Sequence, residues 1–178
     1  MTEQHLGATR IDGPDACRRL LLVGELNPYG ADPDYALYYE PPHSAGGRLQ
    51  RLVLGLPARQ WYLPIWRVNL CVGDFDPEDA AARAAELQGD APWVTIVMLG
   101  RRVQRAFGMP RKSGSINERD FWHTVSTIGA ARRLIGIPHP SGRNPAWNER
   151  GNIERARSLM RHEIPEIPWG SIDTGGGA

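Results

Sequence analysis

The chain has 178 residues, of which 41% are hydrophobic, and a formal net charge of +1 at pH 7. This length and apolar content suffice for a single core, so we expect one domain over residues 1–168 and a disordered tail over residues 169–178. Two cysteines make neither a disulfide framework nor a four-thiolate centre, and we expect no metal and no cofactor. The apolar runs are too short to cross a membrane and residues 1–15 lack the apolar stretch of a signal peptide, which predicts a cytoplasmic location.

The basic residues are arginines except for Lys112. Arginine binds phosphate through a planar fork and stacks on bases, so this composition suits a nucleic-acid partner. A GC-rich codon bias is an alternative explanation for the preference of arginine over lysine. The charge composition alone therefore does not identify a partner.

Strand-like and helix-like patterns alternate along the chain. This order predicts an α/β fold with a central, mostly parallel sheet of four to five strands and helices on both faces. Continuous apolar runs predict strands over residues 20–26, 65–71, 93–99, 121–128 and 133–137. Apolar spacing and capping residues predict helices over 47–56, 77–87, 101–107 and 145–162, with N-caps at Asp76 and Asn144 and a C-cap at Gly108.

The segment from Asn27 to Ser44, between the first strand and the first helix, is rich in Pro, Gly, Asp and Tyr. It is longer than a simple connection in a compact domain needs to be. We therefore predict that it is a binding loop.

Polar residues stand at or near the ends of three predicted strands, where burial does not require them: Asn27, Asn69 and His139. Because the carboxyl ends of parallel strands meet at one edge of a sheet, these side chains could surround one ligand. An amide matches a base edge, and a histidine can stabilise a developing anion. Each residue also has a structural explanation, since an Asn before Pro starts turns, an Asn in a strand can bind backbone, and His139 lies in a strand-to-helix turn.

In order and spacing, these segments resemble the uracil-DNA glycosylase superfamily over about residues 20–160. Residues 23–29, Val-Gly-Glu-Leu-Asn-Pro-Tyr, resemble the first motif of that superfamily. Residues 68–71, Val-Asn-Leu-Cys, resemble the segment whose Asn reads the base edge. Residues 139–142 are similar to the last motif of the superfamily, a His-Pro-Ser turn. Scaffold segments of the thermophile-type branch are similar to residues 45–49 and 97–101.

The resemblance implies a role for each matching residue. Asn27 would orient the attacking water at the sugar C1′, His139 would stabilise negative charge on the departing base, and Asn69 would read the base edge. Arg143 stands where many members carry the wedge that fills the gap left by a flipped base. Further residues implied in binding are Leu26, Tyr29 and Tyr39 around the base, with Tyr38 as a second stacking candidate, and Ser141, Gly142 and Asn144 on the DNA.

The chain also departs from the family. Glu25 stands where most members have a glycine, and the cysteines of the thermophile-type iron–sulfur cluster are missing. Trp147 and Asn148 are not explained by helix capping and could read a bulky polar substituent on the base, because buried hydroxyls need partners. These departures extend the expected substrate from uracil to modified pyrimidines, such as those of phage DNA.

The resemblance thus implies a monomeric, monofunctional DNA glycosylase that acts on single- or double-stranded DNA and leaves an abasic site, in repair or in phage defence. Two alternatives stay open. One is a transferase that modifies a base on the same scaffold, with a second ligand pocket in the loop over residues 31–44. The other is a nucleic-acid-binding module without catalysis; a small-nucleotide hydrolase of similar sheet topology is a weaker third alternative.

Overall fold

A computed structural model describes residues 20–27, 36–56, 65–89, 95–109, 124–128 and 132–164 of the chain. Within them, five strands form one sheet in the order β2-β1-β3-β5-β4. Four neighbouring strands are parallel: β1 (Leu20–Asn27), β2 (Trp66–Val72), β3 (Thr95–Leu99) and β5 (Arg132–Ile137). The edge strand β4 (Thr124–Ile128) runs antiparallel to β5. The predicted α/β class with a mostly parallel sheet is confirmed.

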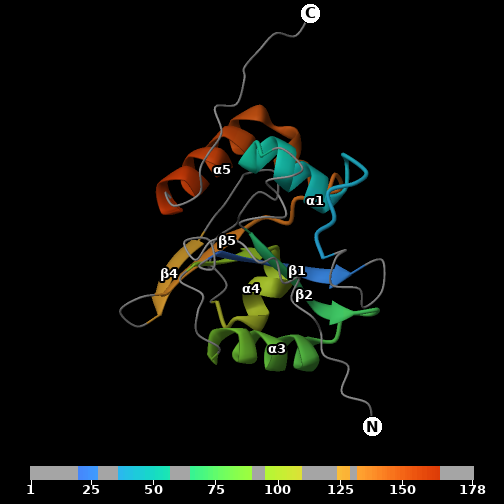
Figure 1. Cartoon of the computed structure of the whole chain (residues 1–178), viewed down its shortest axis with the longest axis vertical. Helices are drawn as coiled ribbons and strands as arrows, with labels where there is room; N and C mark the ends of the chain where they lie inside the picture. Colours follow the sequence, from blue (N-terminus) through green and yellow to red (C-terminus); the bar gives the residue numbers. More distant parts are fainter. Residues whose placement is uncertain are drawn as a thin grey trace, which may run out of the picture.

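Helices cover both faces of this sheet (Figure 1). One face carries α3 (Pro77–Gly89) and α4 (Arg101–Ala106), and the other carries α1 (Ala45–Arg48), the π-helical turn η3 (Leu49–Leu54), the 3-10 turn η4 (Pro145–Asn148) and α5 (Arg150–Glu163). The apolar run of β1 explains the two layers, because successive side chains of a strand point to opposite faces. Leu20 and Leu22 belong to the core under α5, whereas Leu21 and Val23 belong to the core above α3.

The helix ends follow the predicted capping residues. Asp76 accepts hydrogen bonds at one carboxylate oxygen from the backbone N–H groups of Glu78 and Asp79, at 2.7 and 3.0 Å. The first helical segment ends at Gly55, and α4 is followed by Gly108, both at positive φ. Asn144 caps η4 as predicted, since its side-chain oxygen accepts from the N–H of Ala146 at 3.1 Å.

The prediction of one continuous helix from Pro145 to residue 162 is wrong. Glu149 has an extended backbone (φ −96°, ψ 119°) and separates η4 from α5. Two side chains occupy the carbonyls that a continuous helix would use: Asn152 of α5 donates to the Ala146 oxygen at 2.9 Å, and Arg48 of α1 donates to the Trp147 oxygen at 3.0 Å. These bonds favour the break because they replace the missing intrahelical bonds.

Candidate functional site

The carboxyl ends of the four parallel strands lie at one edge of the sheet, and the predicted site residues stand at or near these ends. Asn27 ends β1 opposite Val72 of β2, and Leu99 of β3 pairs with Ile137 of β5. Gly100 directly follows β3, and His139 follows β5 by two residues. This edge is the usual ligand-binding place of an open parallel sheet.

Asn69 lies just below this edge and points across the neighbouring strand. It pairs with Gly24 of β1, and a Cβ atom added to Gly24 would stand only 2.2 Å from the side-chain oxygen of Asn69. The same position would be 3.1 Å from a methyl carbon of Leu37, so Leu37 borders the amide. Only glycine at position 24 leaves room for the Asn69 amide in this place.

The Asn69 amide is buried, with 6% of the residue exposed. Among the described residues neither its oxygen nor its nitrogen has a hydrogen-bond partner. Leaving a buried polar group unsatisfied costs about 1–3 kcal/mol of stability, so such groups call for a functional explanation. A buried amide near the carboxyl edge of a sheet, with no partner among the described residues, is suited to bind the polar edge of a ligand.

Replacing Gly24 with alanine is expected to destabilise the fold by about 1–3 kcal/mol, because the new methyl group overlaps the Asn69 amide. Chemical denaturation measures this change. Gly89→Ala is the matched control, since a Cβ atom there meets nothing within 4 Å. In the Gly24→Ala/Asn69→Ala double variant most of the cost should disappear; additive costs would contradict the proposed contact.

His139 presents its imidazole from the turn after β5. The backbone N–H of Ser141 donates to Nδ1 at 3.3 Å, so this nitrogen is the acceptor and the proton of the neutral ring lies on Nε2. Gly100 packs against the histidine: it has φ +97°, and a Cβ atom there would stand 3.0 Å from His139 Cβ. Burial lowers the pKa of His139, and the Glu25 carboxylate opposes this shift. The site therefore favours a neutral imidazole that offers one N–H donor.

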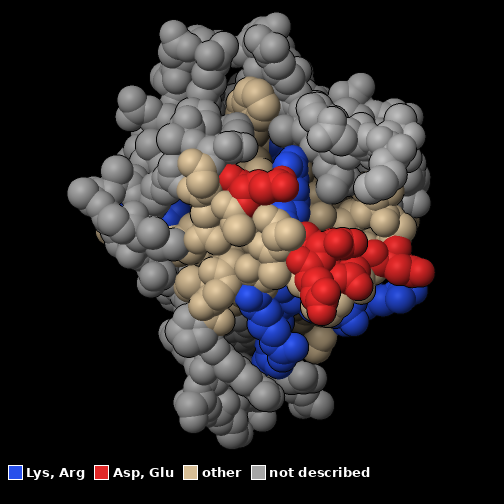
Figure 2. Space-filling model, turned by 90° about the horizontal axis from the view of Figure 1, so that it is seen from below, with Lys and Arg blue, Asp and Glu red and all other residues tan. Residues whose placement is uncertain are grey.

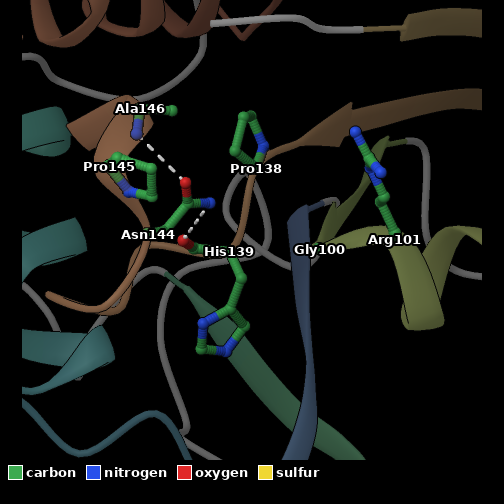
Figure 3. A pocket seen from close by; sticks show the side chains of 7 residues that line it. All are labelled: Gly100, Arg101, Pro138, His139, Asn144, Pro145 and Ala146. Carbon is green, nitrogen blue, oxygen red and sulfur yellow. Dashed lines mark hydrogen bonds between the residues drawn. The ribbon is translucent and has the colours of Figure 1, made fainter. Parts of the chain in front are cut away.

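Asn144 holds the turn that carries His139. Its side-chain nitrogen donates to the His139 carbonyl at 3.2 Å, and its backbone N–H donates to the Ser141 carbonyl at 3.1 Å. Figure 3 shows the Asn144 amide between His139 and Ala146, with the imidazole pointing away from it. A pocket of about 280 Å³ adjoins this turn; its lining consists of Gly100, Arg101, Pro138, His139, Asn144, Pro145 and Ala146.

The other predicted site residues are more scattered. Leu26 packs against the core on the α3 side, and Tyr39 packs against the opposite core with its ring 5.1 Å from that of Tyr38. Gly142 and Arg143 are exposed, and Ser141 is half-buried. The side chain of Asn27 and all of Tyr29 lie outside the described residues.

The two residues that were predicted to read a substituent occupy different environments. Trp147 is 2% exposed and belongs to the core under α5, whereas Asn148 is exposed. Neither lines the 280 Å³ pocket. The structure thus does not place them in the pocket that His139 lines.

Four residues at this edge were not predicted as parts of the site: Gly24, Leu37, Gly100 and Arg48. The two glycines leave room for Asn69 and His139. Leu37 has a left-handed backbone with φ 51°, which is uncommon for a residue with a side chain. A glycine inside an apolar strand is the one sequence signal that could have indicated Gly24.

No family model, curated protein or solved structure matches this chain.

The distribution of charged side chains limits which face of the protein can bind an anionic polymer. On the face that carries α3, acidic and basic side chains lie side by side (Figure 2). Two ion pairs of this region are Arg83–Glu86 and Arg102–Glu25. That face offers no continuous basic surface in the part that the structure describes. The described residues also contain no cluster of three or more His, Cys, Asp or Glu able to hold a metal, and no helix with the length and apolarity to cross a bilayer.

Proposed function

We propose that this protein is a monofunctional DNA glycosylase that hydrolyses the N-glycosidic bond of uracil or a modified pyrimidine. The observation that carries the proposal is the buried amide of Asn69, which has no hydrogen-bond partner among the described residues and lies at the strand edge that also holds His139. An amide offers one acceptor and two donors and so matches the polar edge of a pyrimidine. Leu37 and Gly24 supply apolar surface beside it.

The reaction needs charge stabilisation more than proton transfer. In the proposed mechanism, a water oxygen forms a bond to C1′ while the bond from C1′ to the base nitrogen breaks, and the electron pair leaves with the base. His139 donates its Nε2 proton as a hydrogen bond to the anionic base, and a preorganised donor of this kind contributes most when charge develops. Asn27 orients the water but cannot accept its proton, which passes to solvent.

A base inside a duplex is unreachable, so the target nucleotide must leave the stack. Arg143 is exposed in the turn that follows His139, and its planar guanidinium can stack in the vacated space. In this proposal the DNA approaches the strand edge rather than the α3 face with its mixed charges.

The proposal is tested by incubating the protein with single- and double-stranded DNA that carries uracil, 5-hydroxymethylated or glycosylated pyrimidines, followed by alkaline cleavage at abasic sites. We expect strand cleavage with at least one of these bases, and free base released in equal amount. Tight DNA binding without any cleavage would instead support a non-catalytic binding module. A base of increased mass, detected by mass spectrometry with a group donor present, would support a transferase.

We expect kcat to be independent of pH above about pH 7 and to fall in acid. His139 acts as a neutral donor in the proposed mechanism, and burial lowers its pKa below the 6.5 of an unperturbed histidine. The fall should therefore be centred below pH 6.5, where the imidazole gains a second proton and Nδ1 can no longer accept from Ser141. Single-turnover rates from pH 4.5 to 8 measure this; a rate that rises toward acid would show that the imidazolium is the active form.

The same shift affects stability. Because the folded-state pKa of His139 lies below its unfolded value, its neutral form stabilises the fold above the unfolded pKa. This contribution is lost as the pH falls through the folded pKa.

A further inference from the structure

Arg48 is an oriented cation beside the turn that carries His139. Its Nη2 donates to the carbonyl of Trp147 at 3.0 Å, which orients the guanidinium. Its Nε is buried and has no hydrogen-bond partner among the described residues, and none of the ion pairs found among them includes Arg48. A half-buried guanidinium that meets no anion in the described part of the chain is costly, so an external anion is the expected partner.

The helix that carries Arg48 is held firmly. Ser44 caps α1 by accepting from the Gly47 N–H at 3.0 Å and donates to the Tyr38 carbonyl at 2.9 Å. A Cβ atom on Gly46 would stand 2.0 Å from the Leu37 carbonyl oxygen, so the preceding loop packs directly on this helix. Arg48 is thus preorganised relative to both the loop and the turn.

The other end of the guanidinium faces Gly142. A Cβ atom on Gly142 would stand 3.9 Å from Arg48 Nη1 and 4.0 Å from the His43 carbonyl oxygen, with no closer neighbour. Gly142 and Arg143 next to it are both exposed. An anion in this place would meet the Arg48 guanidinium and the backbone of an exposed turn.

We propose that Arg48, together with the turn Ser141–Arg143, binds a phosphodiester of the DNA strand next to the flipped nucleotide. This inference rests on the proposed function for the identity of the anion. A guanidinium that keeps one side on a protein carbonyl and turns the other side outward suits a phosphate, which accepts two hydrogen bonds from it. Such a contact fixes the register of the strand and brings the target sugar toward His139.

The test measures binding to a duplex that contains one 2′-fluoro-2′-deoxyuridine, a substrate that resists hydrolysis, by fluorescence anisotropy between 50 and 200 mM salt. Arg48→Met is expected to raise Kd by about 10-fold and to lower the slope of log Kd against log salt by about one, as for the loss of one phosphate contact. Arg155→Met, an exposed arginine of α5, is the control for net charge and should change Kd by less than about 2-fold. An unchanged slope in Arg48→Met would overturn the proposal.

A second variant does not depend on how well Arg48→Met folds. Gly142→Asp places a carboxylate next to Arg48 Nη1, on a backbone whose φ allows a side chain. It should raise Kd by at least about 10-fold because the carboxylate takes the place of the phosphate. Ser158→Asp, on the exposed side of α5, adds the same charge elsewhere and should have a much smaller effect. Equal effects of the two aspartates would contradict the phosphate site.

The readouts separate this inference from the proposed function. If the protein cleaves no modified DNA but Arg48→Met lowers the salt slope, the glycosylase proposal fails and the phosphate site stands. If cleavage occurs and neither Arg48→Met nor Gly142→Asp weakens binding, the phosphate site fails alone. Methylphosphonates placed singly on either side of the target should identify one phosphate whose neutralisation weakens wild-type binding but not that of Arg48→Met.

Discussion

Asn69→Leu is expected to make the protein more stable and nearly inactive. Leucine has a similar shape and removes a buried amide that has no partner among the described residues, so the free energy of unfolding should rise by about 1–2 kcal/mol. The same change removes both hydrogen bonds to the base edge, and kcat/KM should fall by about 100-fold or more. Denaturant unfolding and single-turnover base release measure the two effects on one preparation.

Asn152→Leu is the matched control for this prediction. Asn152 is as buried as Asn69, with 3% exposed, but its amide donates to the Ala146 carbonyl at 2.9 Å. The same substitution should therefore destabilise the protein by about 1–3 kcal/mol, opposite in sign to the effect at Asn69. If both variants lose stability equally, the Asn69 amide is bound within the protein, and the observation that carries the proposed function fails.

The fold was largely predictable because its signals are local. The continuous apolar runs of β1 and β3 identify strands buried on both faces, and Asp76 and Gly108 mark helix ends through contacts within a few residues. The break at Glu149 was not predictable in this way. One of the two bonds that favour it, from Arg48 to Trp147, joins residues 99 positions apart.

The positions of Asn69 and His139 in the sheet were predictable for the same reason, whereas their roles stay a prediction. Asn69 and His139 stand out as polar residues at the ends of apolar runs, and the sheet brings both strand ends to one edge. The space that Gly24 leaves for the amide depends on strand register, which only the paired structure provides. Trp147 illustrates the opposite difficulty, because nothing in its neighbours along the chain indicates that it is buried in the core.

His139→Ala should lower kcat by about 100- to 1000-fold, as does the loss of one preorganised donor to a developing anion in other enzymes. KM should change little, since the donor acts on charge that appears only as the glycosidic bond breaks. The fold should persist, because Asn144 bonds to the backbone of the turn rather than to the imidazole. Single-turnover kinetics with excess enzyme measure the chemical step without product release.

His139→Gln distinguishes a specific N–H donor from any polar group. The glutamine amide can donate a hydrogen bond but does not titrate, so this variant should retain more activity than His139→Ala and lose the acid fall in kcat. His162→Gln makes the same exchange at an exposed histidine of α5 and should keep both the rate and the pH profile. An acid fall that survives in His139→Gln would assign the titration to another group and leave His139 without its proposed part in the chemistry.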